Sequence, residues 1–430
     1  MNKIFSLVVL LLAFGLQSIA QISTSSPYSR FGLGDLHENV LPEFSAFGGA
    51  STAFNNSSTV NPNNPASFTS FKPNSFLFST GGWHKTTRMQ NKTEEHTVNN
   101  NAFSHLIVGF PLSEKWGASM GMLPYSSVGY EINARDEDYN ADMNYFGDGG
   151  ISKIYFGGAY EPIENFSIGL KASYLFGGLN RRKQLIFDDE SFMNSRANST
   201  INLKGYYYEL GMLYKHDITE DKQLSLGLTA NNDSKIRAKK SELVESFEYS
   251  GFFETPKDTF LNATVWDSVM LPKYFSAGLS FKNGNKWLFV ADYSIQNWAD
   301  YSMFDESDDL ANSMKISGGM QFTPDYDAVN KYWKLIKFRI GGKYEQSYLQ
   351  LHNTQLNERS VTFGFGLPLR KTKSEINLAV EMGERGTTNN NLIKFSSWLK
   401  KNNNKNLKLT ICLLLVLELV ALLIAHYMFD

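Results

Sequence analysis

The chain of 430 residues contains a single cysteine, and only 20% of its residues are charged. One thiol excludes both a disulfide framework and a zinc site built from several thiolates. Acidic and basic residues nearly balance, with a formal net charge of −2, so a broad cationic surface for nucleic acid is excluded. Aromatic residues make up 14% of the chain and there are 33 glycines, which favours an all-β protein.

Motifs for catalysis and metal binding are missing as well. None of the seven histidines has a close neighbour at metal-ligand spacing, and no phosphate-binding loop, dinucleotide fingerprint or G-x-S-x-G elbow occurs. The acidic stretches at 136–138 and 305–309 favour solvated loops, with calcium binding as the alternative. We therefore expect no enzyme activity, no cofactor and no metal.

The first twenty residues are typical of a secretory signal. Lys3 is followed by the apolar stretch Ile4–Leu16, and Ser18-Ile19-Ala20 before Gln21 is a small-x-small cleavage site. The apolar core is shorter than the roughly 20 residues that span a bilayer, although an uncleaved anchor is the alternative. Residues 1–20 are thus predicted to be a signal peptide that exports the chain.

The other end carries a long apolar run, Leu409–Phe429, after a basic and asparagine-rich flank that begins near Lys400. A helix of this length spans a bilayer. A basic, polar flank followed by an apolar membrane span is typical of an inner-membrane anchor. Our hypothesis is that the chain after about Phe395, or residues 397–430, is a frameshift or fusion product. A genuine C-terminal helix is the alternative.

Residues 74–396 alternate with a period of two, which indicates β-strands. In each run one face is large and apolar and the other is small or polar. Examples are the runs 166–176, 224–230, 314–322, 361–367 and 376–382. Many runs have about ten residues, the length of a tilted membrane strand, and aromatic residues recur near their ends. A soluble sandwich would also alternate in this way.

Short and long connections take turns along this region. The short ones lie at 111–115, 161–165, 217–222, 282–285 and 370–374, and polar stretches such as 133–149, 231–269 and 298–312 lie between them. Outer-membrane barrels have short periplasmic turns and long outside loops, whereas a sandwich has no reason for this pattern. The prediction is an all-β, transmembrane antiparallel barrel of about 14 strands.

Two motifs precede the first predicted strand. The first consists of Ala46, Gly48, Gly49 and Ala50, and the second is Asn64-Pro65-Ala66; the opening from Ser25 to Gly34 is a further match. This segment resembles the N-terminal segment of the FadL/TodX family of outer-membrane transporters for hydrophobic compounds. The resemblance implies that residues 21–73 form a hatch, or plug, inside the barrel.

The resemblance also implies passive, gated uptake of long-chain fatty acids or aromatic hydrocarbons. Phe44, Phe47, Phe54 and Phe68 are candidates for a hydrophobic path, with simple packing of the plug as the alternative. The chain departs from the family pattern because the polar stretch before the second motif has Asn55, Asn56 and Ser57 in place of the usual acidic residue. A salt-bridged gate at that point is therefore in doubt.

The expected location is the outer membrane, and the expected form is a monomer. The predicted partners are hydrophobic small molecules, outer-membrane lipid and lipopolysaccharide, and the barrel-assembly machinery. The basic groups 181–183 and 239–240 are expected near the outside rim, where they meet lipid phosphates. Two rival interpretations are a barrel without transport, serving structure, secretion or surface interaction through its long loop at 231–269, and an outer-membrane enzyme such as a lipase.

Overall fold

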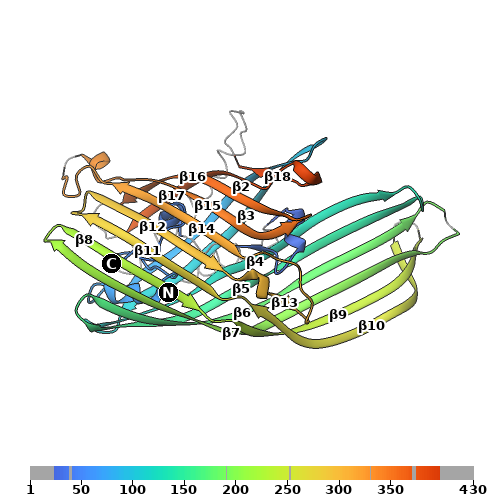
Figure 1. Cartoon of the computed structure of the whole chain (residues 1–430), viewed down its shortest axis with the longest axis horizontal. Coiled ribbons are helices and arrows are strands. Elements are labelled where there is room, and N and C mark those ends of the chain that lie inside the picture. Colours follow the sequence, from blue (N-terminus) through green and yellow to red (C-terminus); the bar gives the residue numbers. More distant parts are fainter. Residues whose placement is uncertain are drawn as a thin grey trace, which may run out of the picture.

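A computed structural model describes residues 24–37, 41–189, 191–250, 253–329, 331–369 and 374–397. Fourteen antiparallel strands close into a barrel, as the sequence predicts (Figure 1). In order around the wall they are β2 (Leu77–Gln90), β3 (Glu95–Pro111), β4 (Trp116–Asp136), β5 (Ala141–Ile163), β6 (Phe166–Phe187), β7 (Asn194–Thr219), β8 (Lys222–Asn231), β11 (Tyr274–Asn283), β12 (Trp287–Gln296), β14 (Ser313–Phe322), β15 (Lys337–Leu351), β16 (Thr354–Pro368), β17 (Glu375–Arg385) and β18 (Lys394–Ser396).

The last strand is short, but it completes the wall. In β18, Phe395 pairs with Arg385 of β17 on one side and with Met89 of β2 on the other. The ladder therefore runs from β17 through β18 to β2, which removes the open sheet edge that an incomplete wall would leave.

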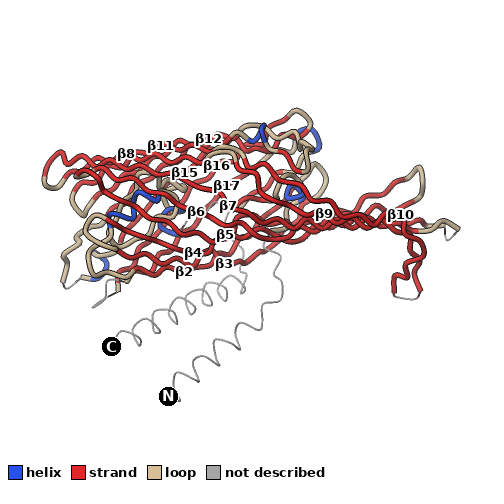
Figure 2. The backbone as a smooth tube through the Cα atoms, turned by 90° about the horizontal axis from the view of Figure 1, so that it is seen from below, coloured by secondary structure: helices blue, strands red, loops and turns tan. Residues whose placement is uncertain are grey.

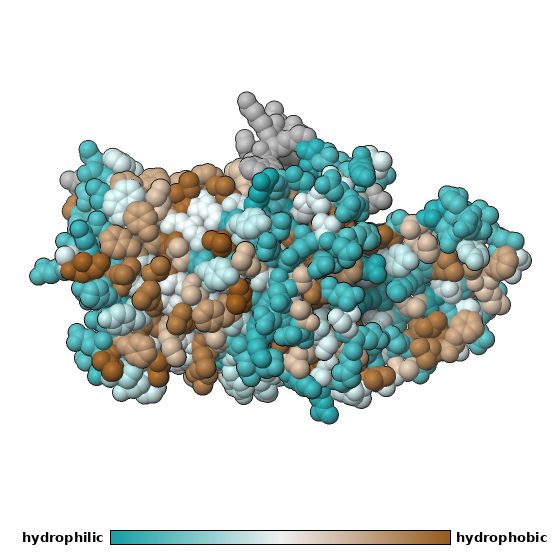
Figure 3. Space-filling view, in the orientation of Figure 1, coloured by the Kyte–Doolittle hydropathy of each residue, from teal (hydrophilic) through white to brown (hydrophobic). Residues whose placement is uncertain are grey.

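The apolar and polar residues that alternate in the sequence face opposite sides of the barrel wall. On β7 the side chains from Asn202 to Tyr214 are exposed at even numbers, while most of those at odd numbers are buried. Exposed apolar residues form a belt around the barrel; they include Ile154, Phe156, Leu170, Tyr208, Leu210, Leu228, Leu279, Ile316 and Phe363. Figure 3 shows apolar side chains gathered over the barrel. Such a belt is the surface that a membrane barrel presents to lipid.

Aromatic pairs border this belt at the end with the short turns. The rings of Trp116 and Tyr160 stack with centroids 4.4 Å apart, and those of Trp287 and Phe322 lie 4.5 Å apart. Aromatic rings favour the interface between lipid and water because they combine an apolar body with a polar edge.

The predicted length of about ten residues holds for β8, β11, β12 and β14, but it is wrong for the strands that continue beyond the apolar belt. β5 has 23 residues and β7 has 26. The stretch 231–269, predicted to be a loop, instead contains β9 (Ser234–Ser250) and most of β10 (Phe253–Leu271). Together with the ends of β5, β6 and β7 these strands form a sheet that extends beyond the barrel (Figure 2). Polar and charged residues occur on both of its faces, so the apolar alternation fades although the backbone pairing continues.

The remaining elements are short. They are the strands β1 (Asp35–Leu36) and β13 (Ser302–Met303), the helix α2 (Pro42–Ser45), and the 3-10 helices η1 (Pro27–Arg30), η2 (Pro65–Ser70), η3 (Trp298–Asp300), η4 (Tyr332–Lys334) and η5 (Asn389–Asn391). No helix in the described ranges has the length and apolar character needed to cross a membrane. The predicted signal peptide and the apolar run Leu409–Phe429 lie outside the described residues.

Candidate functional site

Residues 41–71 of the N-terminal segment pack against the wall near the short turns. At this level the wall strands present glycines, and the segment's backbone approaches them so closely that an added Cβ would clash. The distances from such a Cβ are 1.9 Å to the Phe68 oxygen at Gly117, 2.1 Å to the Thr52 oxygen at Gly227, 2.4 Å to the Pro65 carbonyl carbon at Gly169 and 2.5 Å to the Phe47 carbonyl carbon at Gly341. The glycines therefore make the space that the segment fills.

The first motif forms a tight turn against β16. Gly48 and Gly49 have φ angles of +69° and +94°, which side chains with a Cβ rarely adopt. The Gly48 amide donates to the Thr362 hydroxyl at 3.1 Å, and that hydroxyl donates to the Ala46 oxygen at 3.0 Å. Ala46 and Ala50 are fully buried. Small residues are thus required here by both conformation and space.

The second motif caps η2. The Asn64 side-chain oxygen accepts from the Ala66 amide at 3.0 Å, and Pro65 occupies the first helical position, where an N–H is not needed. The Asn64 amide group donates to the Thr52 oxygen at 2.7 Å and to the Met212 oxygen of β7 at 3.1 Å. The Asn64 side chain therefore caps η2 and also bonds to the preceding loop and to the wall.

Two charged wall residues hold the same segment. The Asp292 carboxylate of β12 accepts from the Ser51 amide at 2.6 Å and from the Thr52 amide at 2.8 Å. Lys171 of β6 donates to the Pro62 oxygen and forms an ion pair with Glu209 at 2.9 Å. The polar stretch 55–60 lacks an acidic residue, whereas the wall supplies the Asp292 carboxylate as a buried acceptor for the backbone of the segment. Sequence reasoning missed Asp292, although a lone carboxylate between exposed Ala291 and Tyr293 is a signal for a lumen-facing role.

The four phenylalanines proposed for a hydrophobic path are buried within the segment. Phe44 and Phe54 meet edge to face with centroids 5.0 Å apart, and Phe47 lies 6.3 Å from Phe54. Phe68 stacks on Phe71 at 5.9 Å. Their exposed fractions are 4% or less. They are placed as a packed cluster, and they line neither of the two cavities described below.

The wall itself has a seam between β3 and β4. These strands pair only from Leu106 opposite Met122 to Pro111 opposite Gly117. Farther from the short turns, the described part of β3 pairs with β2, and β4 pairs with β5. Register shifts interrupt both neighbouring ladders close to this point, at Gly81/Gly82 and at Pro124/Ser126. Pro124 has no N–H to donate, which suits a place where a ladder stops.

Residues 24–37 lie along this seam. The Ser26 amide donates to the Gly129 oxygen at 2.8 Å, and the His37 amide donates to the Tyr125 oxygen at 2.9 Å. Between them, β1 pairs with Ser126 and Ser127 of β4. On the β3 side, the Asn100 amide group donates to the Ser25 hydroxyl at 3.1 Å. The N-terminal segment therefore takes the place beside β4 that β3 leaves.

A cavity of about 310 Å³ opens at the seam. Its lining comes from β3, β4 and β5: Ala102, Phe103, Met122, Leu123, Pro124, Ser126, Ser127, Gly149, Gly150, Ile151 and Ser152. Phe103 and Met122, with exposed fractions of 49% and 39%, also belong to the apolar outer surface. The cavity thus joins the lipid-facing side of the wall to the seam.

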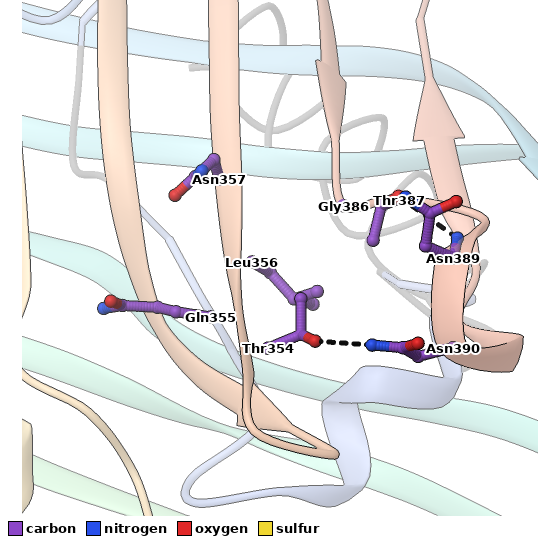
Figure 4. Close-up of a pocket in the computed structure, with 8 residues that line it drawn as sticks. All are labelled: Thr354, Gln355, Leu356, Asn357, Gly386, Thr387, Asn389 and Asn390. Atoms are coloured by element: carbon purple, nitrogen blue, oxygen red, sulfur yellow. Dashed lines mark hydrogen bonds between the residues drawn. The ribbon is translucent and has the colours of Figure 1, made fainter.

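Buried side chains also occupy the lumen toward the long hairpins. A cluster of buried residues links Tyr28 and Leu33 of the N-terminal segment to Trp298, Tyr301 and the surrounding strands. A second cavity, of about 390 Å³, lies beside the β15–β16 turn (Figure 4). Most of the residues that line it have polar side chains, and the Asn390 amide group donates to the Thr354 hydroxyl at 2.9 Å. The seam cavity is therefore the better candidate for an apolar ligand.

Comparisons with known proteins agree on the fold. The toluene transporter TodX of Pseudomonas putida has a TM-score of 0.56 and 16% identity over 84% of this chain and 95% of that one. The toluene transporter TbuX of Ralstonia pickettii has a TM-score of 0.54 and 14% identity over 84% of this chain and 96% of that one. A FadL homologue of Pseudomonas aeruginosa has a TM-score of 0.53 and 10% identity over 82% of this chain and 94% of that one. No curated protein sequence matches. A protein-family profile described as BamG matches residues 1–400.

Proposed function

The chain belongs to the BamG family, and on that premise and its fold we propose that it is an outer-membrane channel for hydrophobic small molecules. The apolar belt and its aromatic border support a place in a membrane. The fold is that of structures described as transporters or channels for toluene and monoaromatic hydrocarbons. The substrate class is accordingly long-chain fatty acids or aromatic hydrocarbons.

The observation that carries the proposal is the seam with its cavity. An apolar solute in the outer leaflet meets Phe103 and Met122 on the outer surface and the cavity between the strands behind them. Entry and exit through the wall keep the solute in apolar surroundings, which avoids the cost of returning it to water. Residues 41–71 act as the hatch that closes the direct route along the axis.

Uptake by proteoliposomes tests this proposal. Purified protein is reconstituted with labelled oleate or labelled toluene, and uptake is compared with that of two variants. Ala102→Trp fills the seam cavity, whereas Ala291→Trp places the same bulk on the exposed face of β12. We expect wild type and Ala291→Trp to transport and Ala102→Trp to lose most of the activity. Equal uptake by all three proteins contradicts the seam as the route.

One observation favours the rival function of a barrel that does not transport. A packed cluster of buried residues lies across the hairpin side of the lumen, and the β9–β10 hairpin offers a large surface beyond the barrel. If no labelled solute enters above the level of protein-free liposomes, a structural or surface-interaction role replaces transport.

A further inference from the structure

A strip of cations lies on the outer face of the wall, just beyond the apolar belt. Along β7 the exposed side chains run Leu210, Tyr208, Tyr206 and then Lys204. Lys204 pairs with Arg237 of β9, and Asn202 in the next row pairs with Lys239. Paired residues on adjacent strands point to the same side of a sheet, so these cations share the face that the belt occupies. We call Lys204, Arg237 and Lys239 the cationic strip.

The height of the strip matches a lipid headgroup layer. Lys204 lies two residues from Tyr206, on the side away from the belt, which is about 7 Å along the strand at roughly 3.3 Å per residue. Tyr206, with an exposed fraction of 63%, marks the aromatic border of the belt at the hairpin end. Basic side chains next to such a border extend toward headgroups while their stems stay on apolar surface.

A tryptophan sits within the strip. Trp266 of β10 pairs with Lys239, and its ring lies 5.5 Å from the Arg237 guanidinium carbon and 5.7 Å from the Lys239 ammonium nitrogen. More than half of Trp266 is exposed. A ring that holds two cations and faces outward fits an interface where acyl chains and phosphates meet.

No carboxylate pairs with any of these three cations within the described chain, whereas several other cations of the extended sheet are paired. Arg182 is paired with Glu254, Arg196 with Glu245, and Lys240 with Glu242. Asn202, Ser268 and Thr264, which lie beside the strip on the same face, are neutral. The positive charge of the strip is therefore not neutralised within the described chain and is available to an anion outside the protein.

From this arrangement we propose that the cationic strip binds the phosphate groups of an outer-leaflet lipid whose acyl chains lie on the belt below. The guanidinium of Arg237 offers a bidentate fit to phosphate, and the two lysines add point charges. The strip revises the rim groups expected from the sequence. Arg181 donates to the Gly32 oxygen, Arg182 and Lys240 pair with carboxylates, and Lys183 lies on the opposite face of the sheet from Lys204. Of those groups only Lys239 therefore belongs to the strip.

Lipid retention in detergent tests the proposal. The protein is mixed with bisphosphorylated lipid A, or with the same lipid after removal of its phosphates, and bound lipid is counted by native mass spectrometry. The variant is Lys204→Gln/Arg237→Gln/Lys239→Gln. The matched control, Lys222→Gln/Lys282→Gln/Lys286→Gln, removes three exposed lysines at the short-turn end. Heat-modified migration on gels verifies that each variant is folded.

We expect the strip variant to bind the phosphorylated lipid roughly tenfold more weakly or worse. The control is expected to bind like wild type, and the dephosphorylated lipid is expected to bind weakly to all three proteins. Inorganic phosphate at equal concentration should not displace the lipid. Unchanged binding by the strip variant, an equal loss in the control, or displacement by inorganic phosphate overturns the proposal. The assay measures no uptake, so its outcome is independent of the channel function.

Discussion

The two parts of the N-terminal segment are held in different ways. Residues 41–71 sit where the wall is fully paired, in space cleared by glycines, and are tied down by buried groups such as Asp292 and Asn64. Residues 24–37 lie where the wall is not fully paired; backbone hydrogen bonds join them to β4, and Tyr28 and Leu33 pack into the buried cluster of the lumen. Residues 41–71 pack against strands that are fully paired, whereas residues 24–37 pair with β4 where β3 does not.

The difference indicates a division of labour. A part that is fixed by steric fit and buried polar contacts cannot leave without large cost. A part that replaces a missing neighbour strand can move by exchanging its backbone hydrogen bonds with β4, and that movement also breaks the ion pair between Asp35 and Arg385 at 3.1 Å and withdraws Tyr28 and Leu33 from the buried cluster. Movement for transport is therefore expected at the seam, and stability is expected to depend on the part near the short turns.

Locking the seam tests this division most directly. Leu36 of β1 pairs with Ser126 of β4, and paired antiparallel residues have Cα atoms roughly 4.5–5.5 Å apart, within the range of a disulfide. In a Cys412→Ser background, the oxidised Leu36→Cys/Ser126→Cys variant should lose nearly all uptake of labelled solute. Reduction with dithiothreitol should restore it.

The matched control joins two strands that are already paired. Thr86 of β2 and Asn99 of β3 face each other with both side chains exposed. A Thr86→Cys/Asn99→Cys disulfide should leave uptake unchanged in both redox states. Full uptake by the oxidised seam variant would show that residues 24–37 need not move.

Filling the glycine space tests the other part. A Cβ at Gly227 would lie 2.1 Å from the Thr52 oxygen, so Gly227→Val should displace residues 51–54 and lower the free energy of unfolding by about 1–3 kcal/mol or more. At Gly158 the nearest atom is 3.9 Å away, so Gly158→Ala should be neutral. The temperature at which the heat-modified gel band appears measures both. Equal stability of the two variants contradicts a tight fit of the segment.

The sequence predicts the barrel well because lipid and lumen impose opposite demands on alternate residues. The runs around 166–176 and 361–367 became β6 and β16 as expected. Beyond the lipid this contrast ends, since water lies on both sides of the strand. Residues 234–250 therefore carry no apolar alternation that would distinguish β9 from a loop, although their backbone pairs with both β7 and β10.

The candidate site was predictable only in part, because its main feature is a missing interaction. The motif residues from Ala46 to Ala66 mark a special backbone, and glycine conformation and asparagine capping explain them. The seam instead depends on which strand ends where. Pro124 is a local hint, but the loss of pairing between β3 and β4 is a property of two strands together.

Removing the carboxylate of Asp292 should weaken the part near the short turns to a smaller degree. Asp292→Ala leaves the Ser51 and Thr52 amides without their buried acceptor, at a cost of about 1–3 kcal/mol. Asp292→Asn keeps an acceptor oxygen and should recover part of the loss. Thermal unfolding followed by gel migration gives both values, with exposed Asp300→Ala as the unaffected control. A full loss in the asparagine variant would show that charge, not hydrogen bonding, holds the segment.

The smallest effect is expected at Glu43, on α2. Burial raises the pKa of the Glu43 carboxyl, and the nearby Arg339 partly opposes the rise. A raised pKa in the folded state means that stability falls as pH increases from the ordinary glutamate range, near about 4.3, through the raised value. Glu43→Gln, which mimics the neutral acid, should match wild type at pH 4 and unfold a few degrees higher at pH 8. Glu137→Gln, in an exposed turn, should change neither temperature. A glutamine variant less stable than wild type at pH 8 would mean that the Arg339 attraction outweighs burial.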